Sequence, residues 1–105
     1  AFPGGEFKHG TLSLIEEGVP VFAFLTDDKS ATLSNAIEAG SRGADLIGIG
    51  TEETDNFQHF IEIPEDENSE ILEIIPFQLL AYETSVLKGN DPDKPRNLAK
   101  SITVK

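Results

Sequence analysis

Residues 19–50 read VPVFAFLTDDKSATLSNAIEAGSRGADLIGIG, and the order of apolar and polar residues in this stretch decides the fold. The apolar run 19–25 does not alternate with polar residues, which indicates a strand covered on both faces. Residues 29–41 repeat apolar positions at helical spacing and follow two aspartates, either of which can cap a helix. A second apolar run spans 44–49. The stretch therefore predicts a strand, a helix and a strand, as in an α/β fold with a mostly parallel sheet.

The flanking sequence extends this pattern in both directions. Upstream, residues 1–9 have the composition of a loop, and a short helix after them is expected to stop at Gly18. Downstream, 59–63 predicts a third strand, whose direction stays open because its connection is short for a parallel crossover. The longest predicted helix covers 68–88 and carries Pro76 in its interior, where a proline kinks a helix.

The predicted helix 68–88 is apolar almost all round, whereas a surface helix needs one apolar stripe. Three strands are also few for a parallel sheet, which is normally covered on both faces. Both features predict that another segment or subunit completes the core. The absence of any methionine fits a piece of a longer protein.

Composition excludes several classes of function. The 105 residues suit one small domain, and they contain no cysteine, which excludes disulfides, thiolate metal sites and cysteine nucleophiles in this stretch. No apolar run approaches the roughly 20 residues of a membrane span. The formal net charge of −11 opposes binding to nucleic acid or anionic membranes. We therefore expect no membrane and no nucleic-acid partner. The absence of cysteine says little about compartment, and the location that we expect is cytoplasmic.

The charge is distributed unevenly along the chain. Residues 1–87 hold seventeen acids and three bases, whereas residues 88–105 hold five bases and two acids. One interpretation is a basic tail that lies on an acidic body. The other is a tail that meets an anion, such as a phosphorylated substrate.

Two residues stand out as candidates for chemistry, although the common phosphate-loop, dinucleotide and nucleophile-elbow motifs are absent. His9 stands at the entry to the first predicted helix, and a neutral imidazole can move protons in either direction. Lys100 has the apolar neighbours Leu98, Ala99 and Ile102, and an amine acts as a nucleophile after losing its proton. By residue type alone, a loop histidine and a tail lysine are more often solvent-exposed and inert. The two histidines show no metal-ligand spacing, so no metal site is predicted.

Three segments resemble the glucosamine-6-phosphate synthases, also called glutamine–fructose-6-phosphate aminotransferases. Gly5-Glu6-Phe7-Lys8-His9-Gly10 resembles that family's Gly-Glu-Leu-Lys-His-Gly motif, and IPFQLLAY (75–82) looks like its long helix. KGNDPDKPRNLAKSITV (88–104) is similar to its C-terminal signature almost residue for residue. The resemblance covers the whole chain in order, and the tail motif is highly specific.

The resemblance implies a partial α/β fold of the sugar isomerase (SIS) type. This fold is a three-layer α/β/α, flavodoxin-like arrangement around a parallel sheet of five strands. Residues 1–105 match the C-terminal portion of the family's second SIS domain, with 90–105 as the C-terminal active-site tail. The implied reaction of amino sugar biosynthesis takes fructose 6-phosphate and glutamine to glucosamine 6-phosphate and glutamate, with no metal or organic cofactor. The implied partners are the sugar phosphates, the upstream isomerase and glutaminase domains, and a second subunit in a homodimer.

Site residues carry over from the family by position. Lys100 matches the lysine that forms a Schiff base with the open-chain ketose, and His9 matches a histidine linked to ring opening in the neighbouring subunit's site. Ala99 matches a backbone contact to the sugar, and Ile102 an apolar position on the ammonia route. Arg96 matches an arginine that helps link the tail to the glutaminase domain. The family's phosphate loop and its glutamate base for enolisation match no residue of this chain.

Three positions depart from the family pattern. Phe7 and Thr11 replace the usual leucine and proline near His9, and Lys105 stands where an acid is common. Two alternative functions stay open from sequence. One is a related SIS sugar-phosphate isomerase or deaminase, whose tails also carry a Pro-Arg-Asn-Leu-like motif. The other is a non-catalytic sugar-phosphate sensor or assembly module, which has no need of an amine at position 100.

Overall fold

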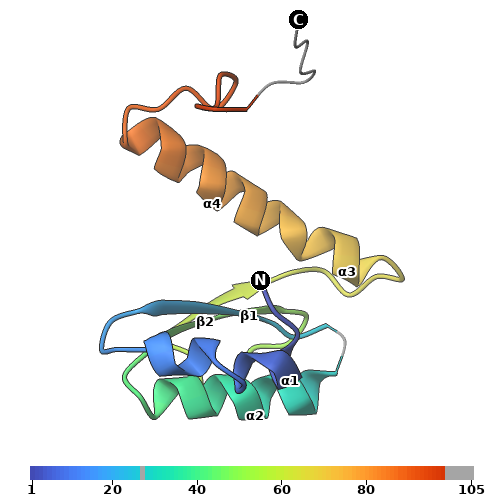
Figure 1. Cartoon of the computed structure of the whole chain (residues 1–105). Coiled ribbons are helices and arrows are strands. Elements are labelled where there is room, and N and C mark those ends of the chain that lie inside the picture. Colours follow the sequence, from blue (N-terminus) through green and yellow to red (C-terminus); the bar gives the residue numbers. More distant parts are fainter. Residues whose placement is uncertain (27, 99–105) are drawn as a thin grey trace, which may run out of the picture. The chain divides into compact units, whose positions relative to one another are not determined.

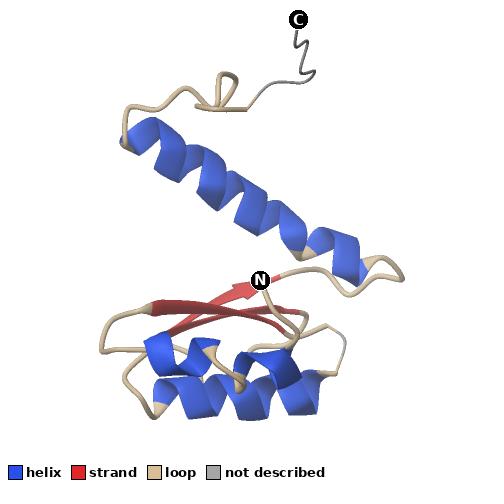
Figure 2. Cartoon of the chain, in the orientation of Figure 1, coloured by secondary structure: helices blue, strands red, loops and turns tan. Residues whose placement is uncertain are grey.

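The computed structural model describes residues 1–26 and 28–98. The chain divides into two compact units, Ala1–Ile74 and Ile75–Lys105. The first unit contains the sheet and its covering helices, and the second contains a long helix and the tail (Figures 1 and 2). Each unit is described by itself.

The first unit contains three strands and several short helices. Its elements are α1 (Gly4–Phe7), the 3-10 helix η1 (Thr11–Leu14), β1 (Pro20–Phe24), α2 (Lys29–Gly40), β2 (Asp45–Gly50), β3 (His59–Glu62) and α3 (Ser69–Leu72). The three predicted strands and the predicted helix after the first of them are all present. The α/β class inferred from residues 19–50 is therefore confirmed.

The three strands form one parallel sheet in the order β1-β2-β3. Gly48 of β2 is in register with Ala23 of β1 and with Phe60 of β3. The direction of β3, which the sequence left open, is parallel even though the connection 51–58 contains no helix. Gln58 helps to fix this register, because Leu46 N–H donates to its Oε1 at 2.7 Å and its own N–H donates to Leu46 O at 3.1 Å.

The core of this unit lies between α2 and one face of the sheet. It is built from six buried apolar residues: Leu12, Ala23, Ala36, Ala39, Ala44 and Leu46. Four of the six are alanines, which allow the helix to lie close to the strands because their side chains are short. Phe7 and Ile15 from the preceding segment pack on the edge of the cluster, so α1 and η1 lie on the same face as α2.

A turn around Gly43 joins α2 to β2. Gly43 has φ +94° and a Cβ there would lie 2.9 Å from the Cα of Glu17, so both its conformation and its space require glycine. Its carbonyl accepts a hydrogen bond from Gly18 N–H at 2.8 Å. This turn therefore ties the end of α2 to the segment that leads into β1.

The N-terminal segment corrects one prediction. Residues 1–9 were expected to form a loop because Pro3, Gly4 and Gly5 disfavour a helix, yet Gly4–Phe7 form the single turn α1. Pro3 O accepts hydrogen bonds from Glu6 N–H at 3.0 Å and Phe7 N–H at 3.2 Å. Packing of Phe7 against the core overrides the weak local preference. The predicted helix that follows is a single 3-10 turn, η1.

The second unit is dominated by α4 (Ile74–Leu87), in which no residue is buried. The single helix predicted over 68–88 is instead two, α3 and α4, and the break falls at Glu73. Pro76 therefore lies in the first turn of α4, where a missing N–H leaves no helical hydrogen bond unmade, and the interruption of the predicted helix falls three residues before the proline.

Candidate functional site

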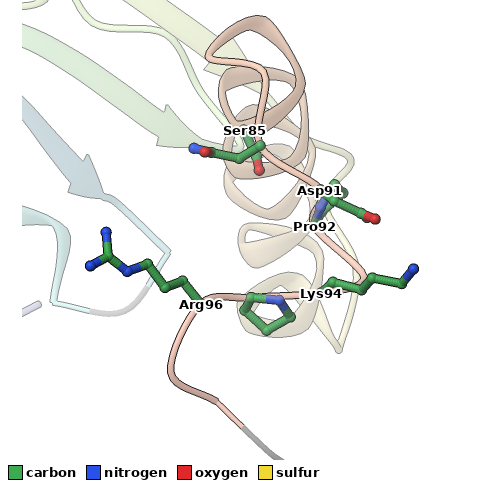
Figure 3. A pocket seen from close by; sticks show the side chains of 7 residues that line it. Ser85, Asp91, Pro92, Lys94 and Arg96 are labelled. Carbon is green, nitrogen blue, oxygen red and sulfur yellow. The ribbon is translucent and has the colours of Figure 1, made fainter.

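A pocket of about 420 Å³ lies in the second unit, where α4 passes into the tail (Figure 3). Ser85 of the last turn of α4 lines one side, and the following loop supplies the rest: Asn90, Asp91, Pro92, Lys94, Pro95 and Arg96. These loop residues are exposed, so the pocket is open to solvent. The last of its lining residues, Arg96, stands four positions before Lys100 in the sequence.

The end of α4 gives this pocket a defined backbone. Gly89, with φ +75°, donates its N–H to Val86 O at 2.9 Å, and Asn90 N–H donates to Ser85 O at 2.9 Å. This pair of bonds is the Schellman arrangement of a helix C-terminus. Beyond it, Asp91 Oδ1 accepts from Asp93 N–H at 3.0 Å, and Asp91 O accepts from Lys94 N–H at 3.1 Å. Hydrogen bonds within the loop therefore fix the backbone from which Lys94 and Arg96 project.

The two cations of the pocket do not converge on one point. Figure 3 shows the side chains of Lys94 and Arg96 pointing away from one another. Within the described part of the chain, neither cation takes part in an ion pair. Both are therefore available to an anionic partner, but they do not form a closed anion cradle by themselves.

His9 lies in the first unit, in the turn between α1 and η1. Its backbone N–H donates to Glu6 O at 3.1 Å, and its side chain is exposed. The next residue, Gly10, accepts two hydrogen bonds from Ser13, from N–H at 3.0 Å and from Oγ at 2.6 Å. The turn thus presents the imidazole to solvent, where it can meet a ligand or another chain.

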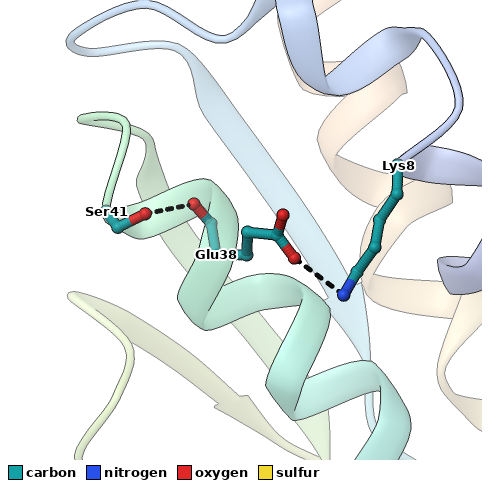
Figure 4. A network of polar contacts seen from close by, with 3 residues as sticks. All are labelled: Lys8, Glu38 and Ser41. Atoms are coloured by element: carbon teal, nitrogen blue, oxygen red, sulfur yellow. Dashed lines mark hydrogen bonds and ion pairs between the residues drawn. The ribbon is translucent and has the colours of Figure 1, made fainter.

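Lys8 connects this turn to α2. Its Nζ lies 2.7 Å from Glu38 Oε2, and Ser41 Oγ donates to Glu38 O at 2.7 Å (Figure 4). Glu38 stands in the last turn of α2, so the pair joins the residue before His9 to a helix that packs on the core.

A second exposed ion pair lies at the other end of α2. Lys29 Nζ is 2.9 Å from Glu52 Oε2, which joins the first turn of α2 to the loop after β2. The hydrogen bond from Lys29, together with its positive charge, lowers the pKa of Glu52 below the ordinary value. The pair neutralises a lysine at the carboxyl edge of the sheet and contains none of the residues singled out for chemistry.

The described residues show no arrangement for a metal ion. Over residues 1–26 and 28–98, no three His, Asp or Glu side chains gather as metal ligands. Across the same ranges, no helix has both the length and the apolar character to cross a membrane.

Comparison with known proteins assigns the family. The model of the SIS domain matches residues 1–88, which is most of the chain. The chain belongs to the SIS domain family. The parallel sheet with α2 against one face is accordingly a partial SIS fold, as the sequence predicted.

This SIS chain is similar to the C-terminal part of glutamine–fructose-6-phosphate aminotransferases. It is 46% identical to that enzyme of Pyrobaculum aerophilum over 99% of its own length, and 48% identical to that of Thermococcus kodakarensis over 95%. It spans 18% of the length of each of these relatives. Among solved structures, the C-terminal domain of glucosamine-fructose-6-phosphate aminotransferase from Francisella tularensis matches with a TM-score of 0.74 and 33% identity. That match covers 90% of this chain and 29% of the solved one.

The SIS chain's predicted site residues fall in three places. His9 lies in the first unit and Arg96 lines the pocket in the second. Lys100, Ala99 and Ile102 lie outside the described residues. The structure therefore describes the surroundings of His9 and Arg96 but does not test the roles assigned by resemblance.

Two residues beside these positions had no signal in the sequence. Ser85 is uncharged and lies in no motif, and its place in the pocket depends on the turn that ends α4. Glu38 was one acid among many expected on a solvated face, and its pairing with Lys8 is a tertiary contact. The uneven charge along the chain did indicate the tail cations Lys94 and Arg96.

Proposed function

We propose that this SIS chain is the C-terminal, sugar-binding part of a glutamine–fructose-6-phosphate aminotransferase. The enzyme converts fructose 6-phosphate and glutamine to glucosamine 6-phosphate and glutamate in amino sugar biosynthesis. The observation that carries this proposal is the 46% identity over 99% of the chain with the Pyrobaculum aerophilum aminotransferase. This match includes the tail around Lys100, to which we assign the chemistry.

In this proposal Lys100 is the nucleophile. Its neutral amine attacks the C2 carbonyl of open-chain fructose 6-phosphate to give a carbinolamine. Uptake of one proton and loss of water then leave a protonated Schiff base. The positive nitrogen withdraws electrons from C2, which makes the C1 proton easier to remove and so promotes isomerisation. Lys94 and Arg96 stand six and four positions before Lys100 in the sequence, and positive charge close to an amine would favour its neutral, reactive form.

The remaining site residues surround this step. His9 moves the proton that accompanies opening of the sugar ring, in keeping with its exposed imidazole. The backbone of Ala99 binds the sugar, Ile102 lines the route by which ammonia arrives, and Arg96 links the tail to the glutaminase domain. No metal or organic cofactor takes part.

The proposal requires partners beyond these 105 residues. An upstream isomerase domain supplies the phosphate loop and the enolisation base, and a glutaminase domain releases ammonia from glutamine. Two copies form a cytoplasmic homodimer in which His9 serves the neighbouring subunit's site. The apolar character of α4 on all sides agrees with a helix that other segments cover.

Trapping the Schiff base tests the proposal directly. The complete enzyme is treated with fructose 6-phosphate and borohydride, digested, and analysed by mass spectrometry. We expect a reduced sugar adduct on Lys100, and none on Lys105, which serves as a control in the same tail. A complete enzyme without an adduct on Lys100 contradicts the assignment of the nucleophile.

A second measurement separates the alternatives. Glucosamine 6-phosphate formation that depends on glutamine indicates the aminotransferase, whereas turnover independent of glutamine indicates a related isomerase or deaminase. Binding of sugar phosphate without any turnover indicates a sensor. The 105-residue chain alone is expected to show no turnover, because the proposed base and phosphate loop are supplied from elsewhere.

A further inference from the structure

The turn that carries His9 has few connections to the rest of its unit. The hydrogen bonds of His9 N–H and Gly10 O stay within the segment 6–13. His9 and Gly10 are both exposed, so neither is held by packing. Within residues 1–26 and 28–98, the ion pair of the turn with another element is Lys8 Nζ to Glu38 Oε2, at 2.7 Å (Figure 4).

Glu38 is well placed to act as an anchor. It lies in α2, between the buried core residue Ala36 and the fully buried Ala39, so its backbone is held by packing on the sheet. α1 approaches the same helix, because a Cβ on Gly4 would collide with the side-chain amide of Asn35, one turn before Glu38. Contact at Gly4 and the ion pair at Lys8 therefore hold both ends of α1 against α2.

We propose that Glu38 is a positioning residue for His9, acting through Lys8. This inference rests on the proposed role of His9 in ring opening. Proton transfer requires the imidazole within hydrogen-bonding reach of the sugar, and small displacements of a catalytic group cost much of its effect. Because the Lys8 and Glu38 side chains are 43% and 39% exposed, the pair contributes little to overall stability. We therefore expect the ion pair to act chiefly by fixing the position of the turn that carries His9.

Glu38→Gln in the complete enzyme tests the proposal. The substitution keeps the shape of the side chain and removes its charge. We expect the kcat/KM for fructose 6-phosphate to fall about three- to tenfold, less than for His9→Gln. Hydrolysis of glutamine in the absence of sugar is expected to stay unchanged, since the glutaminase reaction does not use His9.

Glu52→Gln is the matched control, because it breaks the other exposed lysine–glutamate pair of α2. Its thermal midpoint is expected to equal that of Glu38→Gln, while its kcat/KM for fructose 6-phosphate stays at the level of the parent enzyme. The exchanged pair Lys8→Glu with Glu38→Lys restores the attraction in reverse. We expect it to recover part of the activity that each of its single changes loses.

Three outcomes overturn the inference, and they can be told apart. Equal sugar kinetics for Glu38→Gln and Glu52→Gln show that the ion pair does not position His9. Activity of the exchanged pair no better than that of its single changes shows that attraction between residues 8 and 38 is not what matters. Unchanged activity of His9→Gln instead refutes the proposed role of His9 itself.

Discussion

Lys29 Nζ lies 2.9 Å from Glu52 Oε2 and joins the start of α2 to the loop after β2. The carboxyl end of β1 leads into α2 through Asp28. The Oδ1 of Asp28 accepts a hydrogen bond from Ala31 N–H at 3.2 Å. The cap and the ion pair thus act on the same first turn of α2. Since α2 packs on the sheet, this turn fixes where the helix begins relative to β2.

The Lys29–Glu52 pair predicts a pH dependence of stability. The pKa of Glu52 is lowered in the folded chain by the hydrogen bond and the charge of Lys29. Between that lowered pKa and the ordinary value of 4.5, the unfolded chain binds more protons than the folded chain, so stability rises with pH. The contribution is full above the ordinary value and is lost as pH falls through the lowered one.

Thermal unfolding of the chain and of Glu52→Gln over a pH series measures this effect. We expect Glu52→Gln to be slightly less stable at neutral pH, and the difference to vanish in acid. Glu53→Gln is the control, because it removes the adjacent exposed carboxylate, which forms no ion pair in the described residues. A difference that stays constant down to strongly acidic pH contradicts the linkage.

Gly43→Ala is predicted to destabilise the first unit. Alanine at φ +94° is strained, and its Cβ would lie 2.9 Å from the backbone Cα of Glu17. We expect a loss of about 1–3 kcal/mol in the free energy of unfolding. The matched control is Gly5→Ala in α1, where a Cβ meets nothing within 4 Å, and helix propensity favours alanine. Urea titration followed by circular dichroism distinguishes them, and equal stabilities would be inconsistent with the strained turn.

The sequence was sufficient to predict the elements whose own residues determine them. The apolar runs 19–25 and 44–49 predicted β1 and β2, and the helical spacing of apolar residues between them predicted α2. The sequence did not predict α1, because Gly4 and Gly5 disfavour a helix and the packing of Phe7 that stabilises it is tertiary. The direction of β3 likewise depends on pairing with β2, which local preferences do not encode.

The candidate site was predictable where a motif or a charge pattern marked it. The motif around His9 and the basic tail with Arg96 indicated residues that the structure places in an exposed turn and in a pocket wall. Ser85 joins that pocket because the chain turns at Gly89, and Glu38 meets Lys8 across 30 positions of sequence. Contacts of this kind follow from the fold and not from residue type.

The apolar surface of α4 predicts self-association of the 105-residue chain. Leu79, Tyr82 and Val86 stand on one side of the helix and are 59%, 53% and 46% exposed. Burying such side chains between two copies is favourable, so we expect concentration-dependent dimers or larger species in light scattering. Leu79→Lys is expected to weaken the association by about tenfold or more. Leu14→Lys changes a comparably exposed leucine in η1 as the control, and a strictly monomeric parent chain would refute the prediction.

Lys100→Arg is predicted to abolish synthesis of glucosamine 6-phosphate by the complete enzyme. Arginine keeps the positive charge but does not lose its proton near neutral pH, so it cannot form the Schiff base. We expect kcat to fall on the order of a thousandfold or more, the scale on which removal of an essential catalytic group acts. Binding of fructose 6-phosphate, measured by calorimetry, should change much less, because in this proposal the phosphate loop that holds the sugar belongs to the upstream isomerase domain. Lys105→Arg makes the same chemical change five residues later and should leave synthesis intact. Near-normal kcat in Lys100→Arg would show that charge, and not nucleophilic attack, is what this lysine supplies.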